Sequence, residues 1–343
     1  MKKFLSLALA LVMTASLLAG CGGGSSSGGS TSGGSGASSG AAASQPSGGG
    51  SVSLNFSTGG TQGTYYGFGN VLAQYVSSKT DVSITAVESG GSQANIEALE
   101  EGECQLGFVQ SDVMVYAYNG ERTFAETGAS TGFSTVANLY MEQVQVITVD
   151  PEIKTIADLA GKRVSVGAAG SGVFFNAVDV LGIYGLDVKK DIVPTYQSFG
   201  DSAEALKDGQ IDAAFIVAGA PTTAVTDLAS GRDISVVSLD EEHINKLIEA
   251  SPYYSKATIA KDVYGTAEDA TTVAVGAVVV ARDDVSDADV YNFLYGTFED
   301  IPGLSHGKAA ELDLDFAASV TSIGYHPGAV AYFAEKGITV PGK

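Results

Sequence analysis

Short apolar runs alternate with amphipathic stretches from residue 52 to the C-terminus of the chain. Apolar, β-branched runs between polar turns are typical of strands, and apolar residues spaced three or four positions apart are typical of helices that bury one face. Strands are expected at 52–56, 82–86, 106–109, 144–149, 163–166, 192–196, 213–217, 234–237 and 273–281. Helices are expected at 65–78, 93–101, 173–181, 203–208, 222–230 and 288–298. This order predicts an α/β fold with mostly parallel sheets.

The first twenty residues follow a different pattern. A basic start (MKK) precedes an apolar run at 4–18, and small residues (LAG) precede Cys21. The apolar run is typical of a signal peptide and is too short to span a bilayer. The sequence LAGC resembles the bacterial lipobox, which implies cleavage after residue 20 and a diacylglyceryl group on the sulfur of Cys21. An ordinary signal peptide with a chance cysteine is the alternative.

Residues 22–51 are almost entirely Gly, Ser, Ala and Thr. Such a segment cannot bury enough apolar surface to offset the entropy lost on ordering. We therefore expect 21–51 to be a lipidated cysteine followed by a flexible tether that spans on the order of 30 Å. A chain of 343 residues leaves enough beyond this tether for two domains of ordinary size.

The net charge and the number of cysteines argue against some classes of function. The chain carries 18 Lys and Arg against 39 Asp and Glu, a formal charge of −21. This charge repels phosphate backbones, so nucleic-acid binding is not expected, and it also repels anionic lipid surfaces. With Cys21 acylated, Cys104 has no disulfide partner, and we expect it to be a small buried hydrophobe rather than a catalytic thiol.

Three turns that join an expected strand to an expected helix are rich in Gly and hydroxyl groups. They lie at 57–66 (STGGTQGTYY), 88–95 (ESGGSQAN) and 167–172 (GAAGSG). In open α/β sheets, ligands bind beyond the carboxyl ends of the strands, where helix N-termini present free N–H groups that suit an anion. Glycine lets the ligand approach the backbone, and Ser and Thr add hydrogen-bond donors. The alternative is that these turns are mere connectors.

Two further strand ends carry polar or small residues, at 108–112 (FVQSD) and 210–221 (QIDAAFIVAGAP). Asp112 is either part of a site or simply the N-cap of a helix. No Gly-x-Gly-x-x-Gly fingerprint, P-loop, Gly-x-Ser-x-Gly turn or metal-spaced His and Cys pair is present, so no cofactor or metal is expected. His243 is expected on a solvated face and His326 at the start of a helix.

The ordered set of these motifs resembles the TAXI family, the solute-binding subunits of one class of TRAP (tripartite ATP-independent periplasmic) transporters. The likeness runs from about residue 54 to the C-terminus. It is carried by 57–66, 90–95, 102–112, 161–172, 208–221, 251–254 (SPYY) and 325–329 (YHPGA).

The resemblance implies a two-lobed periplasmic-binding-protein fold of type II. Each lobe is then a mostly parallel sheet flanked by helices, and two crossing hinge strands join the lobes at 144–149 and 273–280. Lobe one is expected at 52–143 and 277–343, and lobe two at 144–276.

The resemblance also implies a ligand between the lobes, a small carboxylate or amino acid such as glutamate or 2-oxoglutarate, and a TRAP-type membrane permease as partner. Carried over to this chain, the ligand-binding positions are Gly60, Thr61, Gly63, Tyr65, Ser92, Asn95, Gln110, Ser111, Ser171, Gly172, Gly219 and Pro221. None of these turns contains an arginine, and Arg163 at a strand start is expected to be structural. We therefore expect backbone N–H groups and hydroxyls to hold the carboxylate.

The chain is thus expected to be a monomeric, non-enzymatic lipoprotein, anchored to the cell membrane on its extracytoplasmic side through the lipid on Cys21. A ligand-sensing lipoprotein that signals to a membrane receptor would have the same fold and site. An exported hydrolase using Ser92 or Ser171 would need a base, and the chain has only three histidines. A surface scaffold would not need three aligned turns.

Overall fold

The computed structural model describes residues 53–343. The expected signal peptide, Cys21 and the expected tether therefore lie outside the described residues. Within 53–343, no helix combines the length and the apolar character that crossing a membrane requires.

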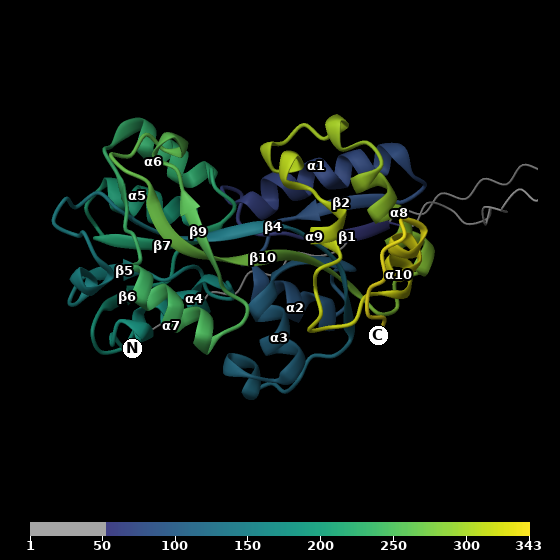
Figure 1. Cartoon of the computed structure of the whole chain (residues 1–343), viewed down its shortest axis with the longest axis horizontal. Helices are drawn as coiled ribbons and strands as arrows, with labels where there is room; N and C mark the ends of the chain where they lie inside the picture. Colours follow the sequence, from purple (N-terminus) through teal and green to yellow (C-terminus); the bar gives the residue numbers. More distant parts are fainter. Residues whose placement is uncertain (1–52) are drawn as a thin grey trace, which may run out of the picture. The chain divides into compact units, whose positions relative to one another are not determined.

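Two long strands, β4 (Phe133–Thr148) and β10 (Ala270–Arg282), pair with each other in antiparallel orientation and run through the middle of the fold (Figure 1). The sheet has the order β2-β1-β3-β10-β4-β7-β5-β6. To one side of the long pair lie the parallel strands β1 (Ser53–Ser57), β2 (Ser83–Val87) and β3 (Leu106–Gln110). To the other lie the parallel strands β5 (Arg163–Ser165), β6 (Val193–Thr195) and β7 (Ala213–Ala218). The short strands β8 (Ser235–Val236) and β9 (Ser255–Ile259) pair with β4 and β10.

Helices flank both halves of the sheet. Around β1–β3 these are α1 (Thr64–Lys79), α2 (Ser92–Glu100), α3 (Ser111–Asn119), α8 (Asp287–Phe298), α9 (Leu314–Ala317) and α10 (Pro327–Glu335). Around β5–β7 these are α4 (Val173–Ile183), α5 (Phe199–Lys207), α6 (Thr223–Gly231) and α7 (Glu241–Ala250). Short 3₁₀ helices occur at Arg122–Ala125, Ile156–Leu159, Lys261–Val263, Ile301–Gly303 and Gly307–Glu311. The α/β class predicted from the alternating pattern is confirmed.

The two halves repeat one topology. Each has three parallel strands in the order 2-1-3, and each places an antiparallel long strand beside the third: β10 beside β3, and β4 beside β7. This is the arrangement of a two-lobed periplasmic-binding-protein fold of type II, in which the long strands cross from one lobe to the other.

Buried apolar side chains form separate sets in the two halves. One set comes from 54–140 and 277–340, with Phe175 added, and the others come from 144–275. The change from one set to the other falls between Tyr140 and Val144 on β4 and between Val275 and Ala277 on β10. We propose that these sets are the cores of two lobes, with the bounds expected from the sequence.

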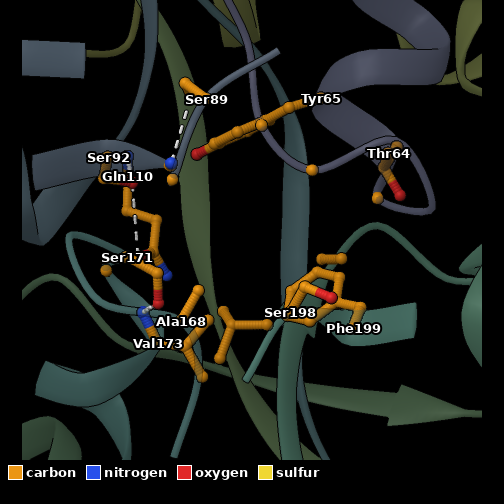
Figure 2. Close-up of a pocket in the computed structure, with 18 of the residues that line it drawn as sticks. Thr64, Tyr65, Ser89, Ser92, Gln110, Ala168, Ser171, Val173, Ser198 and Phe199 are labelled. Atoms are coloured by element: carbon orange, nitrogen blue, oxygen red, sulfur yellow. Dashed lines mark hydrogen bonds between the residues drawn. The ribbon is translucent and has the colours of Figure 1, made fainter. Parts of the chain in front are cut away.

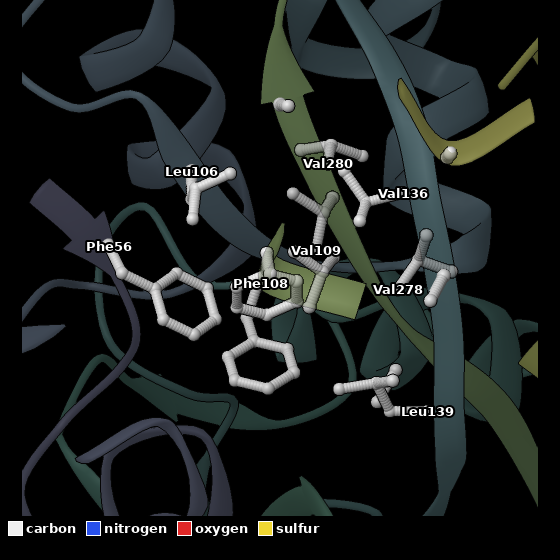
Figure 3. Close-up of a cluster of buried hydrophobic side chains, with 14 of the residues drawn as sticks. Phe56, Leu106, Phe108, Val109, Val136, Leu139, Val278 and Val280 are labelled. Carbon is white, nitrogen blue, oxygen red and sulfur yellow. The ribbon is translucent and has the colours of Figure 1, made fainter. Parts of the chain in front are cut away.

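Aromatic stacking fixes the start of α1 to the sheet of lobe one. Phe108 on β3 is fully buried, and its ring stacks on that of Phe56, with 4.9 Å between the ring centroids (Figure 3). The ring of Tyr65 also stacks on Phe108, with 4.6 Å between the centroids. Offset and stacked aromatic pairs add to the free energy gained by burial alone. The first turn of α1 is therefore held firmly over the end of β3.

The sequence-based strand bounds are wrong for β4. The strand begins at Phe133, eleven residues before the expected start at 144. Ser134, Thr135, Asn138 and Glu142 interrupt the apolar pattern of this stretch, yet all four are buried in the structure. The strand β9 was not predicted either, because its sequence SKATI contains too few apolar residues.

Candidate functional site

A cavity of about 120 Å³ lies where the carboxyl ends of the parallel strands of both lobes meet (Figure 2). The turns after β1 and β2 and the end of β3 line it from lobe one, and the turns after β5 and β6 and the end of β7 line it from lobe two. Glu142 on β4 completes the lining. The three Gly-rich turns therefore come together around one cavity, as the carboxyl-end rule for open α/β sheets requires.

The three helices that follow these turns start without a side-chain cap. Their N-cap residues are Gly63 for α1, Gly91 for α2 and Gly172 for α4, and none has a side chain that could accept from the first turn. Helix α5, whose N-cap Ser198 also lines the cavity, and helices α7 and α8, away from it, begin at capping side chains. Among the described residues, the backbone N–H groups of Tyr65, Ser92 and Gly172 have no acceptor. These N–H groups are available to an anion.

Serine hydroxyls add donors to the same cavity. Ser92 Oγ accepts from the N–H of Gln110 at 3.1 Å, and Ser171 Oγ accepts from the N–H of Val173 at 3.2 Å (Figure 2). Both side chains are buried. Each oxygen is held in place by the backbone N–H that donates to it, while its own O–H can still rotate toward a ligand. The Ser171 hydroxyl has no hydrogen-bond acceptor within the described residues, and the Ser92 hydroxyl has a long contact of 3.5 Å to Gln110 Oε1.

One carboxyl group faces the cavity from the crossing strands. Glu142 is 2 % exposed, and the Tyr65 hydroxyl donates to its Oε2 at 2.5 Å. Burial raises the pKa of Glu142 well above its ordinary range, and the hydrogen bond from Tyr65 opposes this only in part. Burial and the charge of Glu142 likewise raise the pKa of the Tyr65 hydroxyl.

The two lobes approach backbone to backbone over the cavity. The N–H of Ala94 in lobe one donates to the carbonyl of Gly170 in lobe two at 2.9 Å. A Cβ atom on Gly90 would lie 2.8 Å from the carbonyl oxygen of Ala169, too close for any real contact. The N–H of Ala224 donates to the Gln62 carbonyl at 3.3 Å. The structure thus shows the lobes closed.

A buried side-chain network also links the lobes. From lobe one, Gln110 Nε2 donates to Asn176 Oδ1 at 2.7 Å, and Asp112 Oδ2 accepts from Asn176 Nδ2 at 2.9 Å. The same Asn176 nitrogen donates to the Tyr254 hydroxyl at 2.8 Å. Asp112 is fully buried, and its Oδ1 has no partner among the described residues. Burial raises the pKa of Asp112 to about 7.

Seven of the positions expected from the sequence line the cavity: Gly60, Gly63, Tyr65, Ser92, Gln110, Ser171 and Gly172. Arg163 lies away from the cavity and pairs with Asp212 at 2.6 Å, which agrees with the structural role expected for it. Cys104 is buried, and burial raises the pKa of its thiol to about 11. Cys104 therefore stays protonated and behaves as a small buried side chain.

The other five expected positions do not line the cavity. Asn95 uses its whole amide to connect the strand ends: it donates to the carbonyls of Thr58 and Phe108, each at 2.7 Å, and accepts from Ser57 Oγ. Ser111 Oγ accepts from the N–H of Gly276 on β10 at 2.9 Å.

The remaining three positions are Gly219 and Pro221 in lobe two and Thr61 in the turn after β1. Gly219 accepts through its carbonyl from Thr64 Oγ1 at 2.8 Å, a contact between the lobes. Thr61 and Pro221 are exposed. Asp112 is also not the N-cap of α3, because that position belongs to Gln110.

Sequence reasoning missed Glu142, Ser89, Ser198 and Phe199 in the cavity lining. Ser89 lies inside a turn that was recognised, but Glu142 lies in the unpredicted part of β4. A single glutamate in the otherwise apolar and amide-rich stretch 136–147 was the available signal.

A family model described as the NMT1-like family matches residues 56–337. The chain belongs to the NMT1-like family. Among solved structures it is similar to the periplasmic aliphatic sulphonate binding protein SsuA from Escherichia coli, with 19% identity over 83% of this chain and 92% of that chain and a TM-score of 0.43.

It is also similar to a putative L-cystine ABC transporter protein from Listeria monocytogenes, with 14% identity, 79% and 99% coverage and a TM-score of 0.47. A third is the substrate binding protein of an ABC uptake transporter from Streptococcus pneumoniae with bound histidine, at 17% identity, 71% and 85% coverage and a TM-score of 0.41. These identities and TM-scores are too low to carry an argument by themselves. The fold assignment of this family member therefore comes from the strand order described above.

The first prediction concerns the backbone approach between the lobes. Gly90→Ala is expected to hold the lobes apart, because the new Cβ would collide with the backbone carbonyl of Ala169. Amide hydrogen exchange of the Ala94 N–H, which is bonded across the lobes, should then accelerate about tenfold or more. Gly132→Ala is the control, since a Cβ there meets nothing within 4 Å. Equal exchange in both variants would contradict the closed geometry.

The second prediction concerns the pH dependence of closure. Opening exposes Asp112 and returns its pKa toward the ordinary range, so the closed form binds the additional proton. Closure therefore weakens as the pH rises from the ordinary carboxyl range to the pKa of about 7 of the closed form, and it changes little above that. The closed-to-open ratio should fall about tenfold from pH 6 to pH 8.

The distance between labels on the two lobes measures this ratio. Asp112→Asn keeps the buried shape without a titrating group, and the difference between the two pH profiles isolates the carboxyl. A variant profile as steep as that of the unmodified protein would exclude Asp112 as the source.

Proposed function

We propose that this protein is an extracytoplasmic solute-binding lipoprotein that captures a small carboxylate between its lobes and delivers it to a TRAP-type membrane transporter. The observation that carries the proposal is the set of uncapped helix starts from both lobes, which face one cavity at the carboxyl ends of the strands. Free N–H groups at helix N-termini favour an anionic ligand group.

The absence of basic side chains in the lining supports recognition of the carboxylate through the backbone. Within the described part of the chain, no Lys, Arg or His lines the cavity. A carboxylate would therefore be held by the N–H groups of Tyr65, Ser92 and Gly172 and by the hydroxyls of Ser92 and Ser171. We propose that this arrangement binds its ligand without transforming it; none of the three histidines of the chain lines the cavity beside Ser92 or Ser171.

Delivery of the ligand to a transporter would follow from bending at the two crossing strands β4 and β10, which form the proposed hinge. Ligand contacts from both lobes favour the closed form and shift its population, and a membrane partner can recognise the closed surface. The TRAP partner, the lipid on Cys21 and the monomeric state are proposed from the resemblance of the ordered motifs and from the LAGC sequence.

A thermal-shift screen of small carboxylates tests the proposal. A ligand present at 100 times its Kd stabilises the folded state by about 2.7 kcal/mol, which raises the melting temperature by several degrees. Each carboxylate is paired with its uncharged amide. The proposal predicts shifts for one or more carboxylates and none for the matching amides. Shifts that are equal within every pair would contradict it.

The third prediction concerns the hydroxyls. The double variant Ser92→Ala with Ser171→Ala should bind the best carboxylate of the screen more than tenfold more weakly in calorimetry, because it removes a donor from each lobe. The control is Ser78→Ala with Ser230→Ala, two exposed serines that each donate to a carbonyl on their own helix. Unchanged affinity in the first variant would remove both hydroxyls from the site.

A further inference from the structure

Glu142 has no role in the recognition of a carboxylate, yet it occupies the middle of the fold. It lies on β4 opposite Val275 of β10, where the two crossing strands pair. It faces the cavity and is 2 % exposed. A buried carboxyl group is costly unless it is paired, so its place at the ligand cavity calls for a partner.

Only one oxygen of this carboxyl is satisfied by the protein. Oε2 accepts from the Tyr65 hydroxyl, and Oε1 has no hydrogen-bond partner among residues 53–343. Glu142 Oε1 is not one of the fully buried polar atoms that lack a partner. It therefore keeps some accessible surface, and it faces the cavity. The oxygen is therefore oriented by Tyr65 toward whatever fills the cavity.

The charge balance of the lining indicates what that partner is. The cavity carries two carboxyl groups, Glu142 within and Glu88 at the exposed rim, and no basic side chain from the described residues. The buried Lys308 pairs with Glu311 and does not line the cavity, and its charge only partly offsets the burial that raises the pKa of Glu142. A ligand that offers only a carboxylate would leave Oε1 unpaired and next to a second negative charge.

We propose that Glu142 binds a positively charged nitrogen on the ligand, so that the site selects α-amino acids over 2-oxo and 2-hydroxy acids with the same side chain. This rests on the proposed carboxylate-binding function. An α-amino acid carries its ammonium group one carbon away from its carboxylate. The Tyr65 side chain extends from the start of α1 toward Ser92 (Figure 2), so the Oη that holds Glu142 lies near one of the free helix starts. One small zwitterion can therefore reach both.

The alternative to an ionised, accepting Glu142 is a protonated Glu142 that donates a hydrogen bond. A protonated Glu142 could donate to an oxygen of an oxo or hydroxy acid. In that case the nitrogen would confer no advantage, and affinity would fall with rising pH because the carboxyl must keep its proton. With an ammonium partner, Glu142 is ionised in the complex, and binding releases a proton wherever the free protein holds one.

Calorimetry at pH 7 tests this inference. It measures the affinity of the protein for each proteinogenic amino acid and for the 2-hydroxy acid that has the same side chain. We expect the best amino acid to bind at least tenfold more tightly than its hydroxy acid. A hydroxy acid that binds as tightly as its amino acid overturns this inference and leaves the carboxylate function standing. Binding by no member of either series overturns this inference, and the screen of small carboxylates against their amides then decides the proposed function by itself.

Variants test whether Glu142 is the residue responsible for the preference for amino acids over hydroxy acids. Glu142→Gln should reduce the preference for the amino acid to less than threefold, and Tyr65→Phe should reduce it in part because Glu142 is no longer oriented. Glu335→Gln is the matched control, since Glu335 also accepts from a tyrosine, Tyr291 at 2.6 Å, but lies outside the cavity. Retention of the full preference in Glu142→Gln overturns the assignment. If Glu142→Gln does not fold, the unmodified protein and Tyr65→Phe still decide it.

Discussion

The closed structure depends on backbones that approach each other without intervening side chains. The turn after β2 meets the turn after β5 closely enough for the Ala94 N–H to donate to the Gly170 carbonyl at 2.9 Å. Gly90 leaves no room for a Cβ at this meeting point. The same glycine-rich turns leave the Ser92 N–H at the start of α2 and the Gly172 N–H just before α4 without an acceptor among the described residues, so one local feature permits closure and supplies the donors.

The fold was predictable wherever burial and hydrophobicity agree. The runs at 106–109 and 213–217 are apolar throughout, lie inside the sheet and were identified within a residue or so of β3 and β7. The first half of β4 was missed because Asn138 and Glu142 are polar and buried. Their burial depends on neighbours distant in sequence, such as Tyr65 for Glu142, and no local pattern reveals such a neighbour.

The candidate site was predictable at its turns but not in its detail. Glycine and serine at strand ends located the cavity, since backbone geometry places the carboxyl ends of parallel strands together. Residue type alone could not separate Ser92, which faces the cavity, from Asn95 one turn later, whose amide connects three strand-end groups. That difference depends on where the α2 axis lies relative to β1 and β3, and packing of the whole lobe sets this position.

A crystal structure with the tightest-binding ligand of the screen tests the central claim most directly. The account predicts that oxygens of the ligand lie within hydrogen-bond distance of uncapped N–H groups from both lobes, those of Ser92 or Tyr65 on one side and Gly172 on the other. A ligand held mainly by a guanidinium group, or bound to one lobe alone and outside this cavity, would contradict the account.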